Sequence, residues 1–435
     1  MSQLVNFIAY IGFVETLLLL IYAARHYLFT YVALKANPSK VTSNTSATNP
    51  SKSTINNCDE PFISILLPVY NEKNVIDRLL SFCTEFDYNS YEVIVIDDSI
   101  DETTDLLIKW ENHPKIKTLH RNSREGWKGG ALNAGIALIN PQSVYTLVLD
   151  ADFVPPKDLL RRFVKKFNDS STTVVQGYQV HDLNADENWI TKGYRVMLSV
   201  SYLVELTAKN KLKLLLPVTG SVYMIRSDVL KKMRFEGCMT EDWELTLRLY
   251  EAGYKVSYDP TLMASAECPN TLSKYFRQNM RWAEGHTRNA FRQHFWKILR
   301  SRFLTTREKI DFLFQAGVYL NSLLIIATTL GGILTLSSLE YALTLPSVLM
   351  AILFAVAGIP STVFASIVAL HRENLRTSFV NIPNLLLLGY ISAPLVAYAS
   401  LKGLLTDKSY FHRTYKTGKV TKRSLLSELK KLFRK

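Results

Sequence analysis

The chain contains two kinds of apolar run, distinguished by their length and by what separates them. Short runs rich in Val, Ile and Leu cover residues 62–70, 91–99 and 144–152, and stretches with helical spacing at 72–83 and 101–112 follow the first two. Continuous β-branched runs that alternate with helices are typical of parallel strands buried on both faces. The pattern predicts an α/β domain with a parallel-rich central sheet.

Four longer apolar runs flank this domain and predict membrane helices. Leu4–Ala24 is long enough to span a bilayer, which takes roughly 20 residues. Further runs at about 311–338, 343–370 and 383–404 fill the C-terminal third. The first run has no basic residues before it and no small-residue cleavage site, so we interpret it as an anchor and not as a removed signal peptide. We expect a multi-pass integral membrane protein.

Charge asymmetry around the long runs predicts their orientation. No Lys or Arg precedes the first run, whereas Arg25 and Lys35 follow it. The segment 337–347 has no Lys or Arg, while 371–378 has two Arg and one His. By the positive-inside bias, we expect the chain to lie in the cell membrane with its large middle region in the cytoplasm.

The net charge of +13 is concentrated in the C-terminal tail, where eleven Lys and Arg stand against two acids from Lys402 onward. This pattern favours contact with anionic lipid over nucleic-acid binding. The four cysteines show no CxxC spacing, so they predict neither a zinc site nor a disulfide framework.

These features predict a division of the chain into six parts. Residues 1–35 form the anchor, 36–60 a flexible Ser/Thr/Asn/Pro-rich linker, and 61–267 the cytoplasmic α/β domain. Amphipathic interface helices with a Gln-x-x-Arg-Trp pattern follow at 268–310. The membrane region covers 311–404, and a basic cytoplasmic tail covers 405–435.

Polar clusters fall at the carboxyl ends of the three predicted strands, where parallel sheets bind ligands. The clusters are Tyr70-Asn71-Glu72, Asp97-Asp98 and Asp150-Ala151-Asp152. In an extended chain Asp150 and Asp152 would lie on one face, about 6–7 Å apart, and would repel each other unless a cation sits between them. A simple turn at the strand end is the alternative interpretation.

A second element of this edge is Lys128-Gly129-Gly130, which opens a helix between two of the strands. Backbone N–H groups at a helix start and a nearby ammonium suit a phosphate group. Together with the acidic pair, they indicate a diphosphate and a bridging Mg²⁺ or Mn²⁺, which carboxylates and substrate phosphates usually hold jointly.

Six motifs in order resemble those of glycosyltransferase family 2: "PVYNE", "IDDS", "GWKGGALN", "DAD", "TED" and "QNMRW". The resemblance covers residues 61–419 and is closest to the membrane-integrated branch, which includes cellulose, mannan and hyaluronan synthases and ceramide glucosyltransferase. It implies a GT-A fold that binds a nucleotide-diphosphosugar. It also implies an inverting, metal-dependent hexosyltransferase.

The resemblance also implies roles for individual residues. Asp242 would be the catalytic base, with the acidic first turn of a helix as the alternative explanation. Asp150 and Asp152 would bind the metal, and Asp152 is the favoured direct ligand. The substrate-binding residues would be Pro68, Tyr70, Glu72, Asp98, Lys128, Asp150, Gln278, Arg281, Trp282, Phe411, Thr414 and Lys416.

Of these, Gln278, Arg281 and Trp282 are spaced i, i+3, i+4 on a helix over about 272–299. An amphipathic helix in the membrane interface explains the same spacing. Phe411, Thr414 and Lys416 resemble the Phe-x-x-Thr-x-Lys gating segment of cellulose synthases. A basic tail that never visits the active site is the alternative.

Three full spans after a cytoplasmic domain would leave that gating-like segment outside. We therefore expect 383–404, interrupted by Gly389 and Pro394, to be a re-entrant or interfacial hairpin; a break at 358–360 would have the same effect. Glu15 in the first run has no assigned role.

The expected reaction is transfer from a nucleotide-diphosphosugar, UDP-glucose first and GDP-mannose second, to a growing polysaccharide. One transfer to a lipid acceptor, ceramide-like or polyprenyl, is the alternative, and a non-catalytic nucleotide-binding scaffold is a third interpretation. The sequence predicts no oligomeric state.

Overall fold

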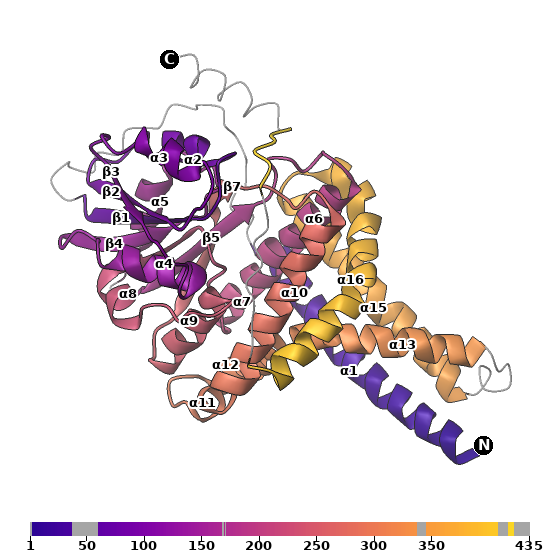
Figure 1. Ribbon diagram of the computed structural model, residues 1–435. Helices are drawn as coiled ribbons and strands as arrows, with labels where there is room; N and C mark the ends of the chain where they lie inside the picture. Colours follow the sequence, from indigo (N-terminus) through magenta and orange to yellow (C-terminus); the bar gives the residue numbers. More distant parts are fainter. Residues whose placement is uncertain are drawn as a thin grey trace.

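The computed structural model describes residues 2–36, 60–167, 169, 171–336, 345–407 and 416–421. The α/β domain is built on one seven-stranded sheet (Figure 1). Its strands, in spatial order, are β3 (Ile116–His120), β2 (Tyr91–Asp97), β1 (Phe62–Val69), β4 (Ser143–Val148), β6 (Tyr223–Arg226), β5 (Val174–Val180) and β7 (Val256–Ser265).

The sheet is mixed, with most pairs parallel. The pairs β1–β2, β1–β4, β2–β3 and β5–β7 run parallel, whereas β6 is antiparallel to both of its neighbours, β4 and β5. The three strands expected from the sequence are present as β1, β2 and β4 and lie side by side. The predicted α/β class with a parallel-rich sheet is confirmed.

Side chains of the central strands alternate between two buried cores, as the period of two in a strand requires. On β1, Ile63, Ile65 and Leu67 point into one core and Leu66 into the other. The first core lies under the short helices α2 (Ile76–Cys83), α3 (Thr103–Ile108) and α5 (Leu159–Val164). The strands are apolar throughout because both of their faces are covered.

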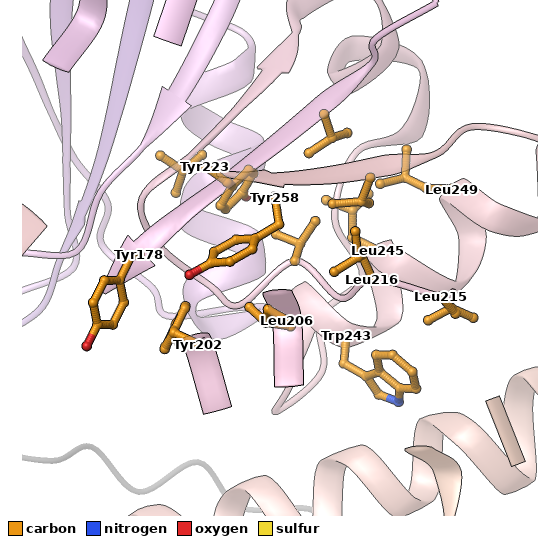
Figure 2. Close-up of a cluster of buried hydrophobic side chains, with 14 of the residues drawn as sticks. Tyr178, Tyr202, Leu206, Leu215, Leu216, Tyr223, Trp243, Leu245, Leu249 and Tyr258 are labelled. Atoms are coloured by element: carbon orange, nitrogen blue, oxygen red, sulfur yellow. The ribbon is translucent and has the colours of Figure 1, made fainter. Parts of the chain in front are cut away.

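The second core holds the larger side chains and connects the sheet to the remaining helices. Figure 2 shows part of it, where Tyr178, Tyr202, Tyr223 and Tyr258 lie near Trp243 and several leucines. The helices on this side of the sheet are α4 (Trp127–Ile136), α6 (Trp189–Val200), η2 (Ser201–Leu206), α7 (Thr207–Leu212), α8 (Ser227–Met233) and α9 (Glu241–Glu251). A short turn, η1 (Lys165–Phe167), follows α5.

The residues after β7 form a nearly continuous helical arm. It consists of α10 (Leu272–Arg288), the π-helical η3 (Asn289–His294), α11 (Phe295–Arg300), α12 (Thr306–Ala316) and η4 (Val318–Leu320). The helix expected over 272–299 is therefore present, with a π-helical turn in its second half. Thr305 caps α12 in a capping box with Glu308.

Four long apolar helices complete the described structure: α1 (Ser2–Lys35) at the N-terminus, and α13 (Asn321–Leu336), α15 (Leu345–Arg372) and α16 (Ile382–Leu405) after the arm, with the turn η5 (Arg376–Asn381) before α16. Figure 1 shows α1, α13 and α15 projecting together away from the sheet. Within the described residues, three segments are long and apolar enough to cross a membrane: Leu17–Lys35, Thr306–Leu330 and Arg376–Leu405.

The hairpin expected over 383–404 is wrong, because these residues form the single helix α16. A break at 358–360 is wrong for the same reason, since α15 continues through Pro360. A proline removes one intrahelical hydrogen bond, and a helix packed against its neighbours tolerates that loss. Here α16 packs against α10, α6 and α13.

The two ends of α16 contact different parts of the structure. At its start, Ile382 and Leu385 join a small core with Val196 of α6. At its end, Lys402 forms an ion pair with Glu284 (2.9 Å), and the Arg292 guanidinium donates to the carbonyl of Leu404 (3.0 Å). The start of α16 therefore packs on α6 of the α/β domain, and its end is held by the helical arm.

Candidate active site

A cavity of about 570 Å³ opens at the carboxyl ends of β1 and β4 and is closed by η2, α9, α10 and η4. It gathers every described residue to which the family resemblance gave a role. These residues are Pro68, Tyr70, Glu72, Asp98, Lys128, Asp150, Asp152, Asp242, Gln278, Arg281, Trp282 and Lys416. Phe411 and Thr414 lie outside the described residues.

The acidic pair follows β4 on a turn and is not part of the strand itself. The strand ends at Val148, and the Phe153 N–H donates to the Asp150 carbonyl (3.3 Å). The two interpretations of the acidic pair are therefore compatible: the residues form a turn, and both line the cavity. The assumption of an extended chain at 150–152 is wrong, because the backbone bends immediately after the last ladder hydrogen bond.

Each carboxylate of the pair has its own lysine. Lys128 Nζ lies 2.7 Å from Asp150 Oδ1, and Lys416 Nζ lies 2.7 Å from Asp152 Oδ2. These two ammonium groups provide positive charge beside the pair, where the sequence analysis expected a cation. The sequence did not reveal the second partner because Lys416 is 264 residues away from Asp152.

The two carboxyl groups respond differently to burial. Burial raises the pKa of Asp150, although Lys128 opposes this shift. Burial also acts to raise the pKa of Asp152, but the ammonium of Lys416 outweighs it and the net pKa is lowered. Asp152 is therefore the more firmly ionised of the two, which suits a metal ligand.

The donor set fits a divalent cation that is shared with a substrate. Two carboxylates side by side provide the oxygen ligands that Mg²⁺ and Mn²⁺ prefer. Within the described part of the chain, no group of three or more His, Cys, Asp and Glu side chains could enclose a metal. The remaining ligands would have to come from the substrate and water, as a diphosphate provides.

Lys128 lies at the centre of the charged groups of the cavity. Its ammonium contacts Asp150, Glu241 (3.3 Å) and the carbonyl of Gly220 (2.7 Å). Burial alone would lower its pKa, but Asp150 and Glu241 outweigh it and raise the pKa further above its usual value. The lysine is therefore positively charged at any physiological pH.

The glycines beside Lys128 are explained by packing. A Cβ on Gly129 would collide with the backbone of Glu236, and one on Gly130 with the backbone of Glu125. Close packing alone therefore accounts for the two glycines, without the phosphate site that the sequence analysis expected there. The helix α4 does start at Trp127, after Gly126 in a left-handed conformation, so the predicted helix start is confirmed.

Asp242 lies in the first turn of α9 (Glu241–Glu251) and has an unusual protonation equilibrium. Its Oδ1 accepts a hydrogen bond from its neighbour, the Trp243 N–H (2.8 Å). Burial in the cavity and the adjacent Glu241 raise the pKa of Asp242 to about 7, against the opposing charge of Lys128. A carboxyl with a pKa near 7 is matched to general-base catalysis at neutral pH.

Two arginines that the sequence analysis did not single out organise the other end of the cavity. Arg121 binds both oxygens of Asp98, each at 2.6 Å. The Arg124 guanidinium lies over the Tyr70 ring, 3.4 Å from its centroid. Both arginines belong to the "RNSREGWKGG" stretch, where their proximity to Lys128 was the available signal.

The Gln278, Arg281 and Trp282 side chains of α10 all reach the cavity, as their spacing predicted. Arg281 donates to the carbonyl of Met239 (3.2 Å), which places it beside the start of α9. The next turn of α10 adds His286, whose ring stacks on Trp243 at 4.4 Å between centroids. His286 and Trp243 were missed because their spacing alone resembles an ordinary apolar face.

The segment 416–421 returns to the cavity and is fastened there by Glu267. The buried Glu267 carboxylate accepts hydrogen bonds from the backbone N–H groups of Thr417 (3.0 Å) and Gly418 (3.3 Å). It also pairs with the buried Arg78 at 2.9 Å. No sequence motif marked Arg78 or Glu267, because their role depends on where the distant tail arrives.

A family model described as "Glycosyltransferase like family 2" matches residues 61–285. The chain therefore belongs to glycosyltransferase family 2, as the resemblance implied.

Relatives support this membership. The chain is 28% identical to the probable glycosyltransferase YdaM of Bacillus subtilis over 56% of this chain and 60% of that protein. It is 25% identical to glucomannan 4-beta-mannosyltransferase 9 of Arabidopsis thaliana over 60% of this chain and 51% of that protein. The chain thus matches only half to three fifths of the length of these relatives.

Among solved structures, the chain is similar to the mannosyltransferase PcManGT from Pyrobaculum calidifontis in complex with GDP-Man and Mn²⁺. The TM-score is 0.55 at 18% identity, covering 93% of this chain and 99% of that one. This likeness shows the fold, and the expected GT-A architecture with apolar helices at both ends is confirmed.

Proposed function

We propose that this protein is a membrane-embedded, inverting hexosyltransferase that transfers a sugar from a nucleotide-diphosphosugar to a saccharide acceptor. The observation that carries the proposal is the position of Asp242. A carboxyl with a pKa of about 7 shares one cavity with Asp150, Asp152 and Arg281. These are the groups that one displacement at a sugar carbon requires.

In the proposed reaction the acceptor hydroxyl attacks the anomeric carbon and gives its proton to Asp242. The bond from that carbon to the diphosphate oxygen breaks, and the nucleoside diphosphate leaves with the electron pair. Inversion follows because attack and departure occur on opposite sides of the carbon. Arg281 stabilises the charge that develops on the diphosphate.

Asp150 and Asp152 would hold Mg²⁺ or Mn²⁺, which when bound neutralises charge on the leaving diphosphate. Lys128 forms ion pairs with both Glu241 and Asp150, which leaves Asp242 as the carboxylate that accepts the proton. Pro68, Tyr70, Glu72 and Asp98 would line the nucleoside end. Gln278 and Trp282 would contact the acceptor sugar, and Lys416, with Phe411 and Thr414, would close over the donor.

We propose that the donor is a nucleotide-diphosphohexose, and two candidates are compared. UDP-glucose is the donor expected from the sequence. GDP-mannose is favoured by the names of the plant relatives and by the GDP-Man bound in the PcManGT structure. The relatives named as glucomannan mannosyltransferases also favour a polysaccharide product over a glycolipid.

We also propose a multi-pass cell-membrane protein with a cytoplasmic catalytic domain, which the charge asymmetry around the long apolar runs supports. If α1, α13 and α15 each cross the bilayer and α16 lies in the interface, both the last turn of α1 and segment 416–421 fall on the catalytic side. This arrangement restores the parity that the sequence analysis sought from a hairpin. The six-part division of the chain stays a prediction.

The test supplies the purified protein in lipid nanodiscs with labelled UDP-glucose or GDP-mannose, with and without Mn²⁺ or Mg²⁺, and sizes the products. We expect metal-dependent incorporation into a ladder of saccharides, abolished by Asp242→Asn. One discrete glycolipid product would favour the lipid-acceptor alternative. No incorporation from either donor would leave the nucleotide-binding scaffold.

A further inference from the structure

The cavity continues past Asp242 into an inner part that the proposed reaction leaves unassigned. This inner chamber lies between η2, α10 and the region of η4. It is lined by Tyr202, Glu205, Lys209, His286, Gln315 and Tyr319. Its charge and its aromatic surface indicate the kind of ligand that it can hold.

The wall of the inner chamber is formed by a π-helical turn. Between the α-helices α6 and α7, the chain adopts a π-helix over Ser201–Leu206. Four of these six residues line the cavity: Ser201, Tyr202, Glu205 and Leu206. Insertions of this kind are rare and are frequently found at functional sites.

The inner end of the chamber is charged. Glu205 keeps 29% of its side chain exposed while its Oε1 pairs with Arg25 of α1 at 3.1 Å. Behind it, the fully buried Lys209 binds Asp311 (3.0 Å) and Gln315 (2.8 Å). Glu205 therefore presents a carboxylate to the chamber, and its ionisation is secured because Arg25 and Lys209 lower its pKa despite burial.

Aromatic side chains, among them Tyr202, Trp243 and Tyr319, form the rest of the wall. The Trp243 ring is stacked on His286 at an interplanar angle of 9°. Among the residues that the structure describes, Trp243 Nε1 and Gln278 Oε1 are buried side-chain atoms without a hydrogen-bond partner. Buried polar atoms of this kind are costly, and a hydroxyl-bearing ligand could pair with them.

Building on the proposed function, we propose that the inner chamber is an acceptor subsite for a hydroxyl-rich saccharide, in which the Glu205 carboxylate accepts hydrogen bonds from sugar hydroxyls. Aromatic faces beside a carboxylate match the two kinds of surface that a sugar ring offers. A lipid acyl chain would strip water from Glu205 without replacing its hydrogen bonds, which is unfavourable. The chamber thus selects a glycan over a lipid tail.

The main variant is Glu205→Gln, which keeps the size of the side chain and removes its charge. Acceptor KM is measured with soluble β-linked gluco- and manno-oligosaccharides of two to six units, and donor hydrolysis by water is measured in parallel. A hydrogen bond to a charged group corresponds to a roughly ten- to hundredfold rise in acceptor KM when it is weakened. We expect a rise of at least tenfold.

The comparison variant is Arg25→Met, which removes a partner of both Glu205 and Asp311 and leaves the Glu205 carboxylate in place, with Lys209 still favouring its ionised form. It should change acceptor KM by less than about threefold, whereas a purely structural role of the pair would affect both variants equally. Binding without turnover is followed by tryptophan fluorescence during oligosaccharide titration in an Asp242→Asn background. Adding Glu205→Gln there should weaken binding by a similar factor.

The outcomes separate the two proposals. If the wild-type protein transfers sugar and Glu205→Gln leaves acceptor KM and oligosaccharide binding unchanged, the subsite is refuted and the proposed function stands. If only ceramide or polyprenyl phosphate in mixed micelles accepts the sugar, the subsite is likewise overturned. If the wild-type protein neither transfers nor hydrolyses any donor, the proposed function fails and the subsite with it.

Discussion

Replacing Asp242 by Asn should abolish sugar transfer and at the same time stabilise the folded protein at pH 8. The carboxyl has a pKa of about 7 in the folded chain and 3.8 as its ordinary value. It therefore holds its proton to higher pH when folded. This favours folding at low pH, and the advantage is lost as the pH rises from 3.8 through about 7.

The size of the effect follows from these two values. One pKa unit corresponds to about 1.4 kcal/mol, so the shift of about 3 units destabilises the folded state by roughly 4 kcal/mol above pH 7. At pH 5, which is about 1.2 pH units above the ordinary pKa of 3.8, the destabilisation of the folded state is only roughly 2 kcal/mol. Asn is neutral at every pH and avoids this cost, while its side-chain oxygen can still accept from Trp243.

The assay is thermal unfolding of the protein in nanodiscs at pH 5 and pH 8, followed by intrinsic fluorescence. A gain of roughly 4 kcal/mol should raise Tm by several degrees at pH 8, and by about half as much at pH 5. Asp186→Asn, at an exposed position, is the control and should change Tm by less than a degree. No gain at pH 8, or an equal gain at both pH values, would refute the assignment of a buried, strained carboxylate.

Three further outcomes are expected. In the wild-type enzyme, kcat/KM should rise about tenfold per pH unit below pH 7 and level off above it, because Asp242 must lose its proton to act as base; a flat profile would exclude it. Lys416→Met should tighten the binding of Mn²⁺ in the absence of nucleotide roughly tenfold, measured by electron paramagnetic resonance, since the ammonium 2.7 Å from Asp152 no longer competes; unchanged or weaker binding would refute this competition. Glu373→Gln should lower the stability by roughly 3–5 kcal/mol, seen as a lower Tm, because the Arg195 guanidinium 2.7 Å away is left buried without its counter-charge; an unchanged Tm would mean that the pair is not buried in solution.

Much of the candidate site could be predicted because its residues lie on short, regular elements. The strand ends of β1, β2 and β4 follow from apolar runs, and polar residues at those ends must share one edge of a parallel sheet. In α10, the i, i+3, i+4 spacing alone places Gln278, Arg281 and Trp282 on one face. These relations depend on neighbours within a few residues, so the order of the amino acids determines them.

Other parts depend on contacts between distant segments, which no local pattern encodes. The sequence determined the strand and helix periods, the long apolar runs and the motif residues of the cavity. Only the tertiary structure decided that Lys416 pairs with Asp152 and that Glu205 closes an inner chamber with Arg25. It also decided that α16 is one helix, because packing against α10 and α6 compensates for a proline that the sequence presents as a break. The physical reason is the same in each case: periodicity is set by the backbone of one segment, whereas charge pairing and packing are set by whichever segment arrives beside it.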